Sequence, residues 1–193
     1  MTMDFATIVK QRRSIRRYEQ TPIPEETLNS WLELIRYVPT GRNEQSLRYR
    51  VITTRALCEK VFRETLWAAA VQPRRTPVWG TSAPLCFVAI CAPEPAGQLN
   101  YAEAGAAAQT LLLAAVADGF GGCWIGAFQR EHVKKLLALD ENQEILYLIA
   151  LGKPAEAPVA EDLPASGDIT YYLDENDCLH VPKRATETLI VRQ

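Results

Sequence analysis

The fold is decided by one stretch of the chain, AGAAAQTLLLAAVADGFGGCWIG (residues 104–126). Its first half is apolar almost all round a helix, which predicts a helix surrounded by protein on nearly every side. Asn100 and Glu103 resemble a capping box that begins this helix. Asp118 and Gly119 should end it in the left-handed conformation that glycine favours. The glycine-rich turn of residues 119–126 follows.

Outward from this stretch, helix-like and strand-like segments alternate along the chain. Hydrophobic spacing predicts helices over residues 4–12, 24–38 and 56–71 and another around Val133 and Leu137, with strands at 49–53, 84–91 and 145–151. The run PLCFVAIC (84–91) is continuously apolar, so it should be a strand in the middle of a sheet. Residues 153–177 are rich in Pro, Ala and Asp, which predicts an arm packed over the domain or over a partner.

Length and charge exclude several classes of protein. With 193 residues, the chain is expected to form one domain, with a core at about 5–154 and a C-terminal arm at 155–193. The 21 basic and 23 acidic residues give a net charge of -2, so no broad attraction to nucleic acid or anionic membrane is expected. The N-terminus does not resemble a secretory signal, and the longest apolar stretch is too short to cross a bilayer. A cytoplasmic location is expected.

The cysteines and histidines point away from thiol, hydrolase and metal chemistry. The five cysteines form no C-x-x-C pair, which favours free thiols and predicts no disulfide framework and no metal site. Only two histidines are present, His132 and His180, and His132 is expected on the surface. The sequence contains neither G-x-S-x-G nor H-E-x-x-H. With so few titratable candidates, the sequence favours a reaction whose chemistry is carried by a cofactor.

Two polar segments could bind a ligand, although each also has a purely structural interpretation. The segment Arg12-Arg13-Ser14-Ile15-Arg16-Arg17-Tyr18 concentrates donors suited to phosphate, but a solvated basic turn after a helix has the same composition. The loop Pro39-Thr40-Gly41-Arg42-Asn43-Glu44-Gln45 carries amides that could bond the edge of a heteroaromatic ring or one another. Either segment by itself is a weak signal.

The glycine-rich turn matches neither of the common phosphate loops. The dinucleotide fingerprint requires a glycine where this chain has Trp124, and the P-loop requires Gly-Lys-Ser/Thr where it has Gly126-Ala127-Phe128. What remains is backbone N–H groups beside Trp124 and Ile125, an arrangement suited to a flat aromatic ligand. A tight turn without a ligand is the alternative.

In this order and spacing, the motifs resemble those of the FMN-dependent nitroreductase family. The resemblance covers about residues 5–154 and ends on LIALGKP (148–154). It implies an α+β fold, a three-layer α-β-α sandwich with a mostly antiparallel central sheet and an extended C-terminal arm. It also implies a homodimer with FMN at the interface.

The resemblance further assigns residues to the flavin site. Arg12, Arg13 and Ser14 would hold the phosphate and ribityl chain, and Arg16 would approach the pyrimidine edge of the ring. The partner subunit would contribute the loop, and the glycine-rich turn would face the flavin N5 and O4. The basic pair in the arm is expected to return to the phosphate. The residues so assigned are Arg12, Arg13, Ser14, Arg16, Pro39, Thr40, Asn43, Trp124, Ile125, Gly126, Lys183 and Arg184.

By this resemblance the protein is an FMN-dependent oxidoreductase that transfers hydride from NAD(P)H, through flavin N5, to a small acceptor such as a nitroaromatic or a quinone. Gln45-Ser46-Leu47 stands where the family often has Gln-Pro-Trp, so the wall of the substrate pocket is expected to differ. Two alternatives stay open. One is a flavin-binding or sensing module without turnover, and the other is a flavin-fragmenting or dehalogenating member of the same fold.

Overall fold

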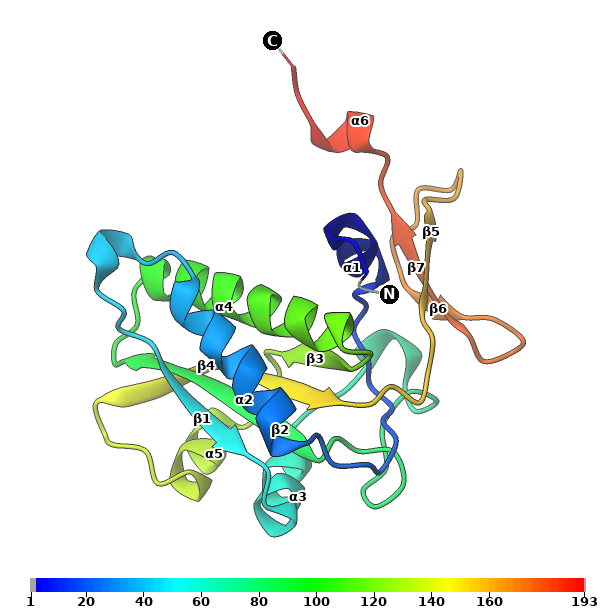
Figure 1. The fold of residues 1–193 in the computed structure, drawn as a ribbon. Coiled ribbons are helices and arrows are strands. Elements are labelled where there is room, and N and C mark those ends of the chain that lie inside the picture. Colours follow the sequence, from blue (N-terminus) through cyan, green and yellow to red (C-terminus); the bar gives the residue numbers. More distant parts are fainter. Residues whose placement is uncertain (1–2, 193) are drawn as a thin grey trace.

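The computed structural model describes residues 3–192 (Figure 1). Its helices and strands follow one another in the order α1 (Phe5–Gln11), α2 (Glu25–Leu34), η1 (Ile35–Tyr37), η2 (Gly41–Asn43), β1 (Arg48–Ile52), α3 (Arg55–Arg63), η3 (Ala69–Val71), β2 (Cys86–Pro93), α4 (Gln98–Ala117), β3 (Gly121–Ile125), α5 (Arg130–Leu136), β4 (Gln143–Gly152), β5 (Val159–Asp162), β6 (Tyr172–Leu173), β7 (Leu179–Lys183) and α6 (Thr186–Leu189).

The central sheet has the strand order β1-β2-β4-β3, and every adjacent pair is antiparallel. Strands β2 and β4 are the two interior strands, and their residues Val88 and Ile149 face each other across the ladder. Both strands are apolar at nearly every position, as expected for strands whose two faces are both covered by protein. The prediction of a central strand at 84–91 is confirmed.

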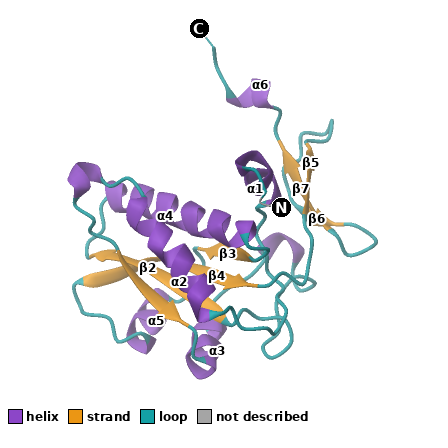
Figure 2. Cartoon of the chain, in the orientation of Figure 1, coloured by secondary structure: helices purple, strands orange, loops and turns teal. Residues whose placement is uncertain are grey.

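Helices cover both faces of this sheet, α2 and α4 on one side and α3 and α5 on the other (Figures 1 and 2). Alternate residues of β2 enter two separate cores, as expected for a strand whose side chains alternate between faces. Val88 and Ile90 pack with Leu111 of α4, whereas Phe87 and Ala89 pack with Val133 of α5. The α+β three-layer sandwich expected from the sequence is confirmed.

Helix α4 buries one face within this chain, including Ala104, Ala108 and Leu111, so the protein predicted on nearly every side is not supplied by one chain alone. It ends as expected, with Gly119 in the left-handed region at a φ of +76°. Its beginning differs from the prediction: Gly97 is the N-cap, and Asn100 lies in the first turn with its side chain accepting from the Gly97 N–H. The residues that the structure describes include no helix long and apolar enough to cross a membrane.

Two predicted elements are corrected. The helix expected over 56–71 ends at Arg63, because the next segment pairs with another part of the chain: the Leu66 N–H donates to the Ala127 carbonyl at 2.9 Å. Most of the turn expected at 119–126 is strand β3. Glycine is uncommon in strands, but at Gly122 a Cβ would lie 2.4 Å from the Ala150 carbonyl oxygen of β4, so this register requires it.

The C-terminal arm contains more regular structure than its composition predicted. Strands β5, β7 and β6 form a second, three-stranded sheet beside the body, with β5 and β7 parallel. Beyond it, α6 and the C-terminal residues extend away from the body (Figure 1). Leu189, Ile190 and Val191 are exposed there.

Candidate functional site

The basic segment of residues 12–18 lies along strand β3 and is not a free turn. The Ile15 N–H donates to the Gly122 carbonyl at 2.9 Å, and Ser14 forms a parallel bridge with the same glycine. A Cβ at Gly121 would lie 2.7 Å from the Ile15 side chain. Gly121 therefore lets this segment approach the sheet, and the bond to Gly122 joins two of the sequence motifs in one place.

Tyr18 anchors the end of this segment. Its ring is buried against Gly152, where a Cβ would lie 2.8 Å from the tyrosine ring. The hydroxyl donates to the Ile15 carbonyl at 2.5 Å, and burial raises the pKa of Tyr18 well above its ordinary value. Tyr18 is therefore a neutral donor that closes the segment on itself and holds Arg16 in place between two anchored residues.

Arg12, Arg13 and Lys183 form a cluster of positive charge. Desolvation and the charge of Arg12 lower the pKa of the Arg13 guanidinium. Desolvation and the charges of Arg13 and Arg12 lower the pKa of the Lys183 ammonium. Among residues 3–192, no carboxylate lies within ion-pair distance of any of the three, and all the ion pairs there involve other basic side chains. Cations that destabilise one another without a counter-ion fit an anion-binding site.

A pocket of about 440 Å³ opens beside strand β3. Arg16 lines it together with Trp124, Ile125 and Gly126, as the resemblance implied. An alanine methyl at Gly126 would meet no protein atom within 4 Å, and its φ is not positive. A substitution at Gly126 would therefore not force the backbone, because the space beside it is open. The lining of the pocket also includes Leu66, Trp67, Ala68, Ala69, Gln72, Cys123 and Ala127.

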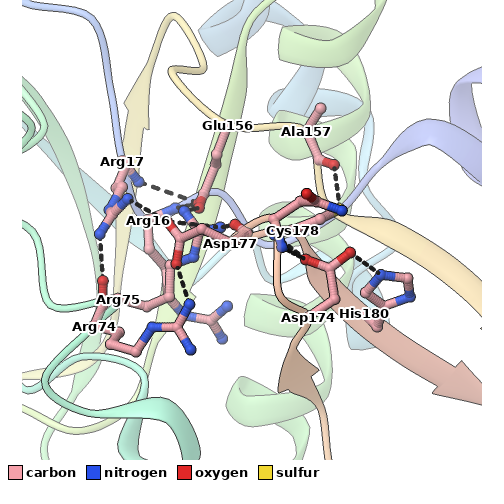
Figure 3. A network of polar contacts seen from close by, with 11 residues as sticks. Arg16, Arg17, Arg74, Arg75, Glu156, Ala157, Asp174, Asp177, Cys178 and His180 are labelled. Carbon is pink, nitrogen blue, oxygen red and sulfur yellow. Dashed lines mark hydrogen bonds and ion pairs between the residues drawn. The ribbon is translucent and has the colours of Figure 1, made fainter.

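Glu156 fixes the backbone around Arg16, a role that the sequence did not indicate. Its carboxylate accepts from the backbone N–H groups of Arg16 and Arg17 and pairs with Arg75 at 2.9 Å (Figure 3). The side chains of Glu156 and Arg75 are only 3% and 5% exposed. The guanidinium of Arg16 lies over the Tyr171 ring, 5.3 Å from its centre. The arm and the loop after α3 therefore position this arginine.

The loop of residues 39–45 lies at the other end of the molecule's long helix. The Gly41 N–H donates to the buried Glu103 carboxylate at 2.7 Å, near the N-terminus of α4. Arg42, Asn43 and Gln45 have positive φ values of 53°, 57° and 48°. Three left-handed residues that are not glycine store backbone strain, which is typical of functional loops. The loop is separated from α1 and the basic segment by the length of α4 (Figure 1).

The structure thus brings together most, but not all, of the residues assigned from the sequence. Pro39, Thr40 and Asn43 do not line the 440 Å³ pocket of their own chain. Lys183 joins Arg12 and Arg13, whereas nothing places Arg184 in either the cluster or the pocket. Leu47, expected near the substrate wall, is buried in the core beside α2 and α4.

Trp67, Gln72 and Glu156 were missed by the sequence reasoning. Trp67 lay inside the helix predicted over 56–71, Gln72 follows that helix directly, and Glu156 lies in a segment without periodicity. The Trp67 indole N–H donates to Thr65 at 2.7 Å, and the Gln72 amide donates to the Trp67 carbonyl at 2.7 Å. The prolines that follow, Pro73 and Pro77, mark the predicted end at residue 71 and give no sign of the observed end at Arg63.

This fold is that of a nitroreductase-type protein. The family model of the nitroreductase family matches residues 9–153. The chain therefore belongs to the nitroreductase family, which confirms the resemblance. The matched range runs from α1 to the end of β4 and leaves out the arm.

Individual relatives agree with this membership. The chain is 30% identical to an NADH dehydrogenase of Thermus thermophilus, over 80% of this chain and 88% of the relative. It is 26% identical to a 4-nitrobenzoate reductase of Nocardioides sp. strain LMS-CY, over 90% and 92% of the two chains. The NADPH:FMN oxidoreductase of Vibrio harveyi, solved with NAD+, superimposes with a TM-score of 0.67 at 22% identity, covering 90% of this chain and 80% of that one.

Proposed function

We propose that this protein is an FMN-dependent oxidoreductase that takes hydride from NAD(P)H and passes it to a small acceptor, such as a nitroaromatic or a quinone. The observation that carries the proposal is the convergence of an unpaired cationic cluster and an apolar pocket on one strand, β3. A ligand with an anionic end and a flat aromatic end matches both. Membership of the nitroreductase family and the printed activities of the relatives support it.

The residues present fit FMN. Arg12, Arg13 and Lys183 would hold the phosphate, because an anion there would offset the desolvation and the repulsion that lower the pKa values of Arg13 and Lys183. The hydroxyl of Ser14, next to them, is a donor for the phosphate or the ribityl chain. The pocket beside Trp124 and Ile125 would take the flavin ring. When bound, FMN supplies the hydride-transfer chemistry that no side chain of this site offers.

The chain's own groups would prepare the pocket for that chemistry. Arg16 places a positive charge in the pocket wall, where it would offset the negative charge of a reduced ring. Glu156 and Tyr171 hold Arg16 in position, which lessens the reorganisation needed during turnover. Leu66, Trp67 and Ile125 provide apolar lining that would exclude water from a bound ring. Burial raises the pKa of Cys123, so its thiol stays protonated and is not a nucleophile.

The proposal includes a homodimer in which the loop of residues 39–45 completes the site of the partner subunit. Within one chain this loop lies near the N-terminus of α4, away from the cationic cluster. Its exposed Asn43 and Arg42 nevertheless carry strained backbone, and the helix beside it exposes Leu99 and Tyr101. A second copy would cover these apolar side chains and bring the loop to a flavin. A cytoplasmic location is also proposed, since five free thiols suit a reducing compartment.

The activity is tested on the purified protein by its visible absorption and by addition of NADH or NADPH. The proposal expects a yellow protein, or a colourless one that becomes yellow with FMN, and bleaching of the colour by one of the two nucleotides. A quinone or nitroaromatic should then restore the colour. Bound FMN that neither nucleotide bleaches would favour the non-catalytic module, and protein that ignores FMN would reject the proposal altogether.

The shared site is tested with two defective chains. One carries Arg12→Ala and Arg16→Ala, the other carries Thr40→Ala and Asn43→Gly, and each pair should abolish most FMN binding in its own homodimer. If the loop serves the partner, a heterodimer purified through two different tags has one intact site and binds one FMN. If both motifs serve the same chain, both sites of the heterodimer stay defective, and no binding returns.

A further inference from the structure

A cluster of ligating side chains lies in the arm, outside the proposed flavin site. Asp174, Cys178 and His180 each direct one ligand atom toward the others, and these atoms all lie within 4.8 Å of one another. They come from the turn that connects β6 to β7 and from β7 itself (Figure 3). The sequence predicted no metal site because no C-x-x-C or H-E-x-x-H spacing is present. The hairpin brings the three residues together instead.

The hydrogen bonds around this cluster prepare the imidazole for a metal. His180 Nδ1 lies 2.7 Å from the Glu161 carboxylate of β5, which leaves Nε2 directed toward Asp174 Oδ2 at 3.3 Å. A carboxylate on the far nitrogen is the usual partner of a metal-bound histidine, because it orients the ring and fixes its tautomer. Stacking on the Tyr172 ring, 5.0 Å away between ring centres, holds the same orientation.

Asp174 is also arranged to bind a metal, because its two carboxylate oxygens have different partners. Oδ1 accepts from the backbone N–H groups of Asn176 and Cys178, at 3.0 and 2.7 Å, and so shapes the turn. Oδ2 is thereby directed toward His180. Cys178 is only partly buried, and its sulfur has just one weak contact, 3.7 Å from the Ala157 carbonyl. All three residues are only partly buried.

We propose that Asp174, Cys178 and His180 bind a zinc ion, with water in the fourth position. A thiolate and an imidazole select zinc over calcium or magnesium, and one carboxylate with one thiolate neutralises its charge. Tetrahedral coordination places ligand atoms roughly 3.5 Å apart, so the cluster needs to contract by only about 1 Å. The thiol of Cys178 releases its proton to the solvent when the metal binds.

A metal at this position would stabilise the attachment of the arm to the body. Asp177 lies within the turn between two of the ligands, and its carboxylate contacts Arg17 at 3.1 Å and Arg74 at 2.9 Å (Figure 3). Its backbone carbonyl accepts from Arg75, which also pairs with Glu156. Fixing the turn therefore fixes the contacts that surround Arg16. The bound ion would be structural, and the flavin site would not depend on it for chemistry.

The test is calorimetric titration of ZnCl₂ into the full-length, FMN-loaded protein after removal of metals with a chelator. Wild type should bind one zinc per chain, and Cys178→Ser and His180→Gln should each weaken binding at least tenfold. Glu161→Gln should weaken it by roughly 10- to 100-fold, as loss of such an orienting carboxylate typically does. Retained yellow colour and an unchanged circular dichroism spectrum would show that the variants are folded.

His132→Gln is the matched control. His132 also pairs with a carboxylate, Glu64 at 3.0 Å, but it belongs to no cluster of three ligating side chains in the described part of the chain. Its substitution should leave zinc affinity unchanged. X-ray absorption of the zinc-loaded protein should detect one sulfur ligand at about 2.3 Å. The proposal would be overturned if wild type took up no zinc, or if the Cys178 and His180 variants bound zinc as tightly as wild type. A zinc site without a sulfur ligand would overturn it as well.

Discussion

The basic segment of residues 12–18 and the polar loop of residues 39–45 both consist of arginine, hydroxyl and amide side chains, yet the fold supports them differently. The first is fixed to a central element: Ile15 and Tyr18 are buried, and Ile15 pairs with Gly122 of β3. The second projects from the N-terminal end of α4, with exposed side chains and three left-handed residues. One segment lies against the chain's own pocket, and the other does not.

The difference teaches why the proposed homodimer is needed: in it, a single chain would carry two halves of different sites. The half made by residues 12–18 lies against β3 and places Arg16 in the wall of the pocket. The half made by residues 39–45 has no pocket in its own chain, although it maintains a strained conformation. Strain that persists on an exposed loop is explained if a second copy uses it. Each prediction below would strengthen or remove this contrast.

The largest effect is expected where the basic segment meets the sheet. Gly122→Ala would place a methyl 2.4 Å from the Ala150 carbonyl oxygen, a backbone atom that cannot rotate away. We expect a loss of about 3 kcal/mol or more of unfolding free energy, at the upper end of overpacking effects. Urea denaturation measures it, with Gly126→Ala as the control, since the control methyl meets no protein atom within 4 Å. Equal stability of the two variants would contradict the close packing of β3 against β4 and α4 at Gly122.

The second effect concerns the charge cluster. Arg12→Ala should weaken FMN binding about tenfold or more, because a charge-assisted hydrogen bond contributes roughly 1.5–3 kcal/mol. Arg13→Ala and Lys183→Ala should act in the same direction. Arg184→Ala is the matched control, because nothing places Arg184 in the cluster. Titration of the apo-protein with FMN gives the affinities, and a larger loss in the Arg184 variant than in the Arg12 variant would overturn the phosphate assignment.

The third effect separates function from stability in the loop. Asn43 has a φ of +57°, so Asn43→Gly removes the amide while keeping a backbone conformation that glycine adopts freely. FMN affinity should fall about fivefold, the value of one neutral hydrogen bond near 1 kcal/mol, with unfolding free energy changed by less than about 0.5 kcal/mol. Asn43→Ala should cost about 1 kcal/mol more in stability, because alanine disfavours this region. If Asn43→Gly left FMN affinity intact, the loop would have no role in the site.

How much of the structure could be predicted depends on whether each element is determined by its own residues or by contacts with distant parts of the chain. Strands β2 and β4 and helix α4 follow from local apolar patterns, and those predictions are confirmed. The end of α3 could not be predicted in this way. Residues 64–71 continue a helix-like pattern in the sequence, but in the structure Leu66 pairs with Ala127 instead. Likewise, no local pattern marks Glu156, whose function arises from contacts with Arg16 and Arg75 on distant segments. Motifs could be recognised, but their partners across the fold could not.

The smallest structural effect, and the most specific one, is expected at the end of β3. Gly126 adjoins the pocket, its φ is not positive, and an added methyl meets no protein atom. Gly126→Ala should therefore change unfolding free energy by less than about 1 kcal/mol, and its methyl would reduce activity only by contact with a bound flavin. We expect quinone reduction by NAD(P)H to fall about tenfold, corresponding to about 1.4 kcal/mol of barrier. Cys123→Ser on the same strand is the comparison: burial raises the pKa of this thiol, so it takes no part as a thiolate, and its loss should affect stability more than turnover. Steady-state rates of both variants, each normalised to bound FMN, decide between the two roles. A strong loss in Cys123→Ser with little loss in Gly126→Ala would mean that the thiol, and not the open backbone of the strand, is what the pocket requires.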